Sequence, residues 1–166
     1  MKGTPVLQDR ERIADVLTTL AFACDDKNWE QFGRLFTDRL HYDASRHSGK
    51  PAADLTVEEF TAVARGVLDG FDCTHHALSN KLITVAGDEA RCRAYVVAYH
   101  YVAAEPGAVD YCVMRGYCTF GLRRIRDEWL ISRWEVVRTA PLEGSPEVYR
   151  IAAEKVARHP YEIGSS

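Results

Sequence analysis

The sequence has no long apolar run, no basic excess and no regular cysteine spacing, and each absence excludes a class of protein. No apolar stretch approaches the roughly 20 residues that a bilayer-spanning helix needs, so we expect no membrane segment. The net charge of −3 and the scattered arginines offer no basic surface to a phosphate backbone, which argues against nucleic acid as a partner. No internal repeat or low-complexity segment is visible.

The cysteines and histidines also lack the patterns of disulfide or metal frameworks. The five cysteines form an odd set without a C-x-x-C pair, and the N-terminal residues lack the apolar segment of an export signal. These features favour a reduced, cytoplasmic location. The histidines do not occur in the paired spacings of zinc sites, so we expect no bound metal.

The length of 166 residues suits one domain with one sizeable core. Residues 9–138 carry the clear periodic patterns and are the expected core of that domain. The tail, residues 141–166, contains a charged, weakly amphipathic stretch at 146–159, which is expected to be a last helix or an arm that contacts another subunit.

Helical periodicity dominates the first part of the chain. Residues 9–24 repeat apolar side chains at the spacing of an amphipathic helix, and residues 28–36 predict a short second helix. The capping box that begins at Thr56 predicts a third helix, through residue 67. Between the predicted second and third helices, the sequence indicates a short strand at 40–43 and then a polar loop that is long enough to be a lid.

From residue 75 onward the period changes to two, which predicts long antiparallel strands at 89–102, 111–124 and 128–138. His100 falls on an inward face, and so do Cys118 in the next strand and Trp134 with Arg138 in the last. Three helices followed by such strands predict an α+β fold with helices packed on one face of a curved antiparallel sheet. Small inward residues leave room for an internal pocket.

Two residues far apart in the sequence could form an acid/base site. Asp25 lies at the polar end of the first helix, and His76 is expected to point inward with Asn80 on the same strand face. A carboxylate at one imidazole nitrogen orients the ring and leaves the other nitrogen to exchange protons. The alternatives are that Asp25 caps the helix near residue 28 and that His76 is a buried histidine bonded to a carbonyl.

Six short motifs in order resemble the SnoaL-like family of the nuclear transport factor two-like superfamily. They are CDDKNW at 24–29, RLFTD at 34–38, THHALSN at 74–80, AYVVAYH at 94–100, RGY at 115–117 and DEW at 127–129. The resemblance covers roughly residues 9–138 and implies a cone-shaped α+β barrel around a pocket, in a homodimer or homotrimer.

The resemblance also implies a chemistry. In similar lyases, namely scytalone dehydratase, a hexachlorocyclohexane dehydrochlorinase and a bile-acid dehydratase, the residues that match Asp25 and His76 form the working dyad. His100 matches a second pocket histidine, and Arg138 looks like a pocket arginine. Gly116 and Cys118 replace the Ser and Asn that help to bind substrate in scytalone dehydratase, so its substrate is not carried over.

The remaining candidate substrate-binding residues follow from their positions in the pattern. Tyr42 could donate a hydrogen bond to a substrate oxygen, although such tyrosines often cover a core. Arg138 could clamp an anionic group, although arginines at strand ends more often form surface ion pairs. Trp134, Asn80 and Cys118 are expected to line the pocket.

Together these patterns predict a cofactor-independent lyase of the dehydratase type, acting on a small cyclic or polycyclic hydroxylated compound. His76 would remove a proton from carbon while Asp25 orients its ring, and His76, His100 or a tyrosine would protonate the departing oxygen. An isomerase could use the same dyad. A different class is a non-catalytic ligand-binding protein, like the small subunits of aromatic-ring dioxygenases, which share this fold.

Overall fold

The structure, a computed structural model, describes residues 4–158 and the side chains from residue 6 onward. The end of the predicted tail, residues 159–166, lies outside the described residues. The described elements are α1 (Thr4–Asp25), α2 (Trp29–Gly33), β1 (Phe36–Asp43), α3 (Ser45–Ser48), β2 (Ala53–Thr56), α4 (Val57–Leu68), β3 (Cys73–Ala86), β4 (Glu89–Tyr101), β5 (Tyr111–Ile125), β6 (Glu128–Arg138), β7 (Glu143–Gly144) and α5 (Glu147–Arg158).

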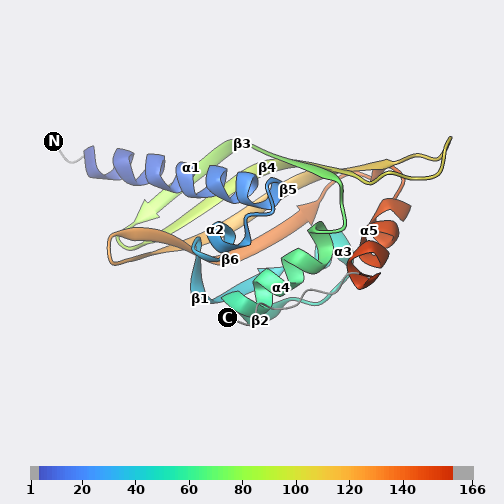
Figure 1. The fold of residues 1–166 in the computed structure, drawn as a ribbon. Coiled ribbons are helices and arrows are strands. Elements are labelled where there is room, and N and C mark those ends of the chain that lie inside the picture. Colours follow the sequence, from blue (N-terminus) through green and yellow to red (C-terminus); the bar gives the residue numbers. More distant parts are fainter. Residues whose placement is uncertain (1–3, 159–166) are drawn as a thin grey trace.

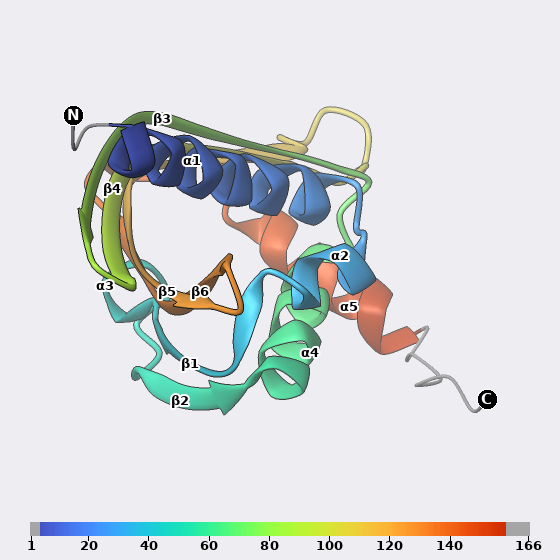
Figure 2. The same ribbon diagram turned by 90° about the vertical axis from the view of Figure 1, so that its left-hand side faces the viewer.

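One curved sheet carries the fold (Figure 1). Its main path runs β2-β1-β6-β5-β4-β3, and β7 pairs with β5. The pair β1–β6 is parallel, whereas the other pairs are antiparallel. Figure 2 shows the sheet curling from β3 and β4 round to β1 and β2, with α1 lying along β3 and the helices α2, α4 and α5 on the open side.

The predicted α+β class, a curved sheet with helices around a pocket, is confirmed. The sheet does not close, because β2 and β3 remain its edges. Helices cover the opening; α5 is the last helix that the sequence offered as one reading of the tail, and α3 adds to the predicted helices. Among the described helices, none combines the length and the apolar composition that crossing a bilayer requires.

Local sequence signals explain several element boundaries. Asn28 caps α2 by accepting a hydrogen bond from the backbone N–H of Gln31 at 3.1 Å. The predicted capping box of α4 is confirmed, since Thr56 and Glu59 each accept from the other's backbone N–H. The predicted second helix extends too far, because Phe36 is already the first residue of β1.

Two β-bulges change which residues face the interior. The register of β3 against β4 shifts between Ser79 and Leu82, where Asn80 has a φ of 53°. Leu82 is consequently 68% exposed, and Ile83 takes the inward position at 6%. An extra residue on one strand moves every later side chain to the opposite face.

The second bulge makes Ser132 the extra residue of β6, because Leu122 pairs with Ile131 and Gly121 with Arg133. Strict alternation along β6 would put Ser132 on the same face as Trp134. The structure instead buries Ile131 completely before the bulge and returns Trp134 to the inner side after it.

The core fills the space between the inner sheet face and the helices. Aromatic rings of α2, β1 and α4 pack together, with ring centroids 4.9 Å apart for Phe32 and Phe36 and 5.1 Å apart for Phe36 and Phe60. Trp134 of β6 joins this cluster, stacked 6.4 Å from Phe36. Three of these rings, Phe32, Phe60 and Trp134, line the cavity described below.

Candidate active site

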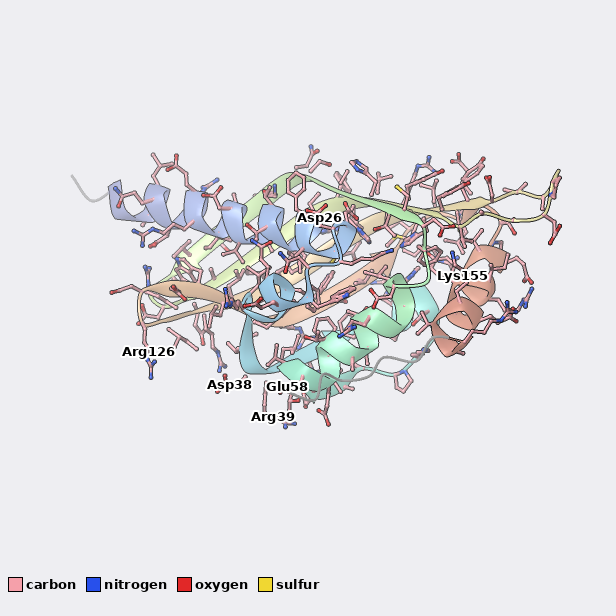
Figure 3. All side chains as sticks on the ribbon, viewed as in Figure 1. Asp26, Asp38, Arg39, Glu58, Arg126 and Lys155 are labelled. Atoms are coloured by element: carbon pink, nitrogen blue, oxygen red, sulfur yellow. The ribbon has the colours of Figure 1, made fainter. Side chains whose placement is uncertain are left out.

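Asp25 and His76 meet at the C-terminal end of α1. The last residue of α1 turns its carboxylate toward β3, whereas the next residue, Asp26, is exposed (Figure 3). His76 Nδ1 lies 2.7 Å from Asp25 Oδ1, and the His76 backbone N–H donates to Oδ2 at 2.9 Å. The Thr74 hydroxyl donates to Oδ1 at 2.8 Å. The carboxylate is therefore held by three contacts to one strand, so its capping of α2 is not observed.

The hydrogen bonds favour the ionised form of Asp25 and determine which nitrogen of His76 faces it. Burial raises the pKa of Asp25, but the hydrogen bonds from His76 and Thr74 lower it by more, so the pKa lies below its usual value. An ionised carboxylate only accepts hydrogen bonds, so Nδ1 of His76 carries the proton that lies between them. Nε2 is then the nitrogen with a free lone pair, as a general base requires.

His76 lines a cavity of about 130 Å³ between the sheet and α4. An engineered cavity of roughly 150 Å³ is large enough for benzene, so this volume suits a single ring. Most of the lining is apolar. It comprises Cys24, Phe32, Tyr42, His47, Phe60, Val63, Ala64, Val67, Leu68, His76, Val96, Ala98, His100, Met114, Cys118, Trp134, Val136 and Tyr149.

The structure brings most predicted site residues to this cavity. Tyr42, His100, Cys118 and Trp134 all line it with His76. Burial raises the pKa of the Cys118 thiol to about 12, so this group stays protonated. Cys118 therefore acts as a small buried side chain, as its position in the strand suggested.

Of the predicted substrate-binding residues, two do not line the cavity. Asn80 is exposed at the bulge of β3, because the register shift removes it from the inward face of His76. Arg138 pairs with Gly116 at the end of β6 and is not among the lining residues. Its charge is near enough to lower the pKa of His47, after burial, which is the larger cause.

His100 is the second imidazole of the cavity. It is 5% exposed, and its ring centroid lies 5.4 Å from that of His76 at an interplanar angle of 87°. Burial, with a smaller contribution from the charge of His76, lowers the pKa of His100 to about 3. The ring is therefore neutral at physiological pH.

Sequence reasoning missed two polar residues of the cavity. Tyr149 comes from α5, in the tail that was expected to be a helix or an arm, and its hydroxyl lies 3.1 Å from Nδ1 of His100. His47 comes from α3, inside the loop that was considered as a lid. Within the described structure, His47 Nδ1 and Trp134 Nε1 are buried without a hydrogen-bond partner. The only sequence signal for Tyr149 was the weak amphipathic pattern of its helix.

A larger hollow of about 530 Å³ lies elsewhere, among residues of β1, β2, β4, β5 and β6 that include Arg39, Asp54 and Arg133. It contains neither member of the dyad, so volume alone does not locate the chemistry. Across residues 4–158, no group of three or more His, Cys, Asp or Glu side chains is placed to hold a metal ion.

The profile of the SnoaL-like domain matches residues 5–135. The chain belongs to the SnoaL-like family. No curated protein matches this chain. Among solved structures, the protein Kfla4162 of Kribbella flavida is 25% identical with a TM-score of 0.79, and the match covers 87% of this SnoaL-like chain and 97% of Kfla4162.

Two further structures with this fold bear the names of lyases. A protein of Novosphingobium aromaticivorans, provisionally assigned as a scytalone dehydratase, is 20% identical with a TM-score of 0.66, covering 87% of this chain and 89% of its own. A hexachlorocyclohexane dehydrochlorinase, LinA type 2, is 15% identical with a TM-score of 0.71, covering 86% and 93%. At these identities the likeness establishes the shared fold.

Proposed function

We propose that this SnoaL-like protein is a cofactor-independent lyase of the dehydratase type, in which His76 is the base and Asp25 orients it. The observation that carries the proposal is the 2.7 Å contact between Asp25 Oδ1 and His76 Nδ1 at the wall of an apolar cavity. An oriented base in a water-poor site is worth roughly two to four powers of ten in rate. Dehydratases and dehydrochlorinases among the structural neighbours support the reaction class.

The reaction begins when Nε2 of His76 removes a proton from a carbon that is acidified by an adjacent carbonyl. The electron pair of the broken C–H bond forms the new C=C bond, and the C–O bond to the hydroxyl group on the next carbon breaks. His76 then passes its proton to the departing oxygen, so water leaves and the ring returns to its neutral form. Neutral His100 and Tyr149, whose pKa is raised by burial, are poor acids for this last step.

A one-ring β-hydroxy ketone tests the proposal. The protein should convert 3-hydroxycyclohexanone into cyclohex-2-enone and water, followed by the ultraviolet absorbance of the conjugated product. His76→Ala and Asp25→Asn should each lower the rate by about 100-fold or more. His75→Ala is the matched control, because His75 is the exposed neighbour of His76 on the same strand, and it should retain the parent rate.

Circular dichroism would establish that the variants keep the fold. Rates of the two dyad variants within a few-fold of the parent would remove the dyad from the reaction. An isomerase with the same dyad would convert cyclohex-3-enone into cyclohex-2-enone and would release no water from the hydroxy ketone. The expected homodimer or homotrimer stays a prediction, which light scattering on the purified chain checks.

A further inference from the structure

The last helix supplies a polar group to the cavity. The Tyr149 hydroxyl of α5 lies 3.1 Å from Nδ1 of His100, and both side chains line the cavity. The Phe71 ring packs edge-on against Tyr149, with centroids 5.4 Å apart at 90°. Tyr149 lies beyond residues 5–135, which the family profile matches.

The position of Tyr149 is set by close packing of α5 against the turn that precedes β3 (Figure 1). A Cβ atom on Gly70 would lie 1.9 Å from the carbonyl oxygen of Ala152, so only glycine allows this approach. Val148 and Ala152 are completely buried, and Lys155 Nζ bonds Asp72 Oδ1 at 2.5 Å. Contacts before and after Tyr149 in the sequence therefore hold α5 in this position.

The Tyr149–His100 contact uses one of the two donor protons of the pair, and the backbone of Cys112, whose hydrogen bond slightly raises the pKa of His100, is another protein group beside this ring. A neutral phenol and a neutral imidazole together hold two donor protons, and the bond between them uses one. If Tyr149 donates to Nδ1, the N–H at Nε2 of His100 remains, and if Nδ1–H donates, the Tyr149 hydroxyl proton remains. Burial keeps both groups neutral, since it lowers the pKa of His100 and raises that of Tyr149.

The absence of charged side chains from the described cavity lining favours an uncharged ligand. No Lys, Arg, Asp or Glu side chain lines the cavity within the described part of the chain. A carboxylate or phosphate would lose its water there without gaining a countercharge, which is costly in an apolar site. The exposed side chains of Val63 and Val67 add apolar surface to the lining.

We propose that the Tyr149–His100 pair donates a hydrogen bond to the carbonyl oxygen of the substrate, and that the substrate is an uncharged one-ring ketone with a hydroxyl group on the β carbon. This inference rests on the proposed function. Proton removal by His76 places negative charge on that oxygen, and a fixed donor stabilises the charge without giving up its proton. The 5.4 Å between the His76 and His100 rings puts base and donor beside the same ligand.

The test measures the bound carbonyl directly. Cyclohexanone labelled with ¹³C at the carbonyl is bound to the protein, and its C=O stretch is read by difference infrared spectroscopy. We expect a stretch at lower frequency in the parent than in Tyr149→Phe, and affinity for cyclohexanone about fivefold to tenfold weaker in the variant. Tyr95→Phe is the control, because Tyr95 is 59% exposed, and it should match the parent.

Turnover gives a second readout. Tyr149→Phe should lower kcat for 3-hydroxycyclohexanone by about 100-fold, with a smaller change in KM, because the donor acts mainly on the charged oxygen of the transition state. His100→Gln alters the same pair from the other side and should give the same shift of the C=O stretch. It keeps the test decisive if Tyr149→Phe fails to fold.

The outcomes separate this inference from the proposed function. An unchanged C=O stretch in both variants, no binding of cyclohexanone, or equal binding of cyclohexanecarboxylate would overturn the inference while leaving the dyad untouched. A C=O shift that depends on Tyr149 in a protein without elimination activity would support the donor pair and reject the lyase. His76→Ala should keep the shift and lose turnover.

Discussion

Mild acid should destabilise this fold through His100. The side chain is 5% exposed, and burial lowers its pKa to about 3. His76 and His47 lower the pKa further, whereas Asp25 opposes them. Tyr149 is a hydrogen-bond partner of the ring, and a hydrogen bond with the Cys112 backbone raises the pKa of His100 slightly. A histidine in the unfolded chain has a pKa of about 6.5, so the unfolded state binds a proton that the folded state refuses.

The sign and size follow from this difference. Between about pH 6.5 and pH 3 the unfolded state carries the extra proton, so the free energy of unfolding falls as the pH falls. Each pH unit costs about 1.4 kcal/mol, and acidification from pH 6.5 to 5 therefore costs about 2 kcal/mol. A typical domain has only about 5–15 kcal/mol to lose. Carboxylates with a lowered pKa, such as Asp25 and Asp9, contribute only below about pH 4.

Urea denaturation at pH 7, 6.5, 6, 5.5 and 5 measures the effect. The parent should lose stability steadily below pH 6.5, and His100→Gln should flatten the curve. His75→Gln is the control, because His75 is exposed, and its curve should follow the parent. His47, whose pKa burial also lowers, should contribute a smaller part that His47→Gln removes. A parent curve that is flat from pH 7 to 5, or an equal slope in His100→Gln, would refute the reasoning.

Three further predictions concern stability. Gly70→Ala should displace α5 and lower Tm, and hydrogen exchange should show the loss of protection within α5. Asp9→Asn should cost about 1 to 2 kcal/mol at pH 7, because Arg124 bonds this carboxylate at 2.8 and 2.6 Å. Since Arg124 lowers the pKa of Asp9, the difference from the parent in urea titrations should vanish as the pH falls below about 4. Phe32→Ala should cost about 3–5 kcal/mol in the same titrations, because Phe32 is fully buried against other rings.

Much of the fold could be predicted because its signals are local. The capping box formed by Thr56 and Glu59 marks the start of α4 in a segment of four residues. Strict alternation of apolar and polar residues predicted that His100 faces the interior of β4. The turn before β6 has positive φ values at Arg126 and Asp127, which suits the tight hairpin that the alternation on both sides requires. Each of these features depends on neighbours in the sequence.

Errors in predicting which strand residues face the interior came from places where the alternation of inward and outward side chains is interrupted. Asn80 was assigned to an inner face because the pattern was continued through it, and a β-bulge lies there; a second bulge makes Ser132 an extra residue of β6. A bulge adds one residue to one strand, and no residue type requires it, so an ungapped reading of the sequence passes over it. Arg138 keeps the parity of Trp134 after the second bulge, but it lies at the end of β6 and does not line the cavity.

Contiguous residues were enough to predict the three main helices, the long strands, the inward His76 and His100 and the family resemblance, because apolar periodicity and short motifs are local properties. The tertiary structure was needed to bring Asp25 to His76, 51 positions away, since that contact depends on how α1 lies along β3. It also decided that Tyr149 reaches His100, because the close approach of α5 to Gly70 is a matter of space between distant backbones. Packing in three dimensions, which periodicity does not encode, assembles the cavity and its chemistry.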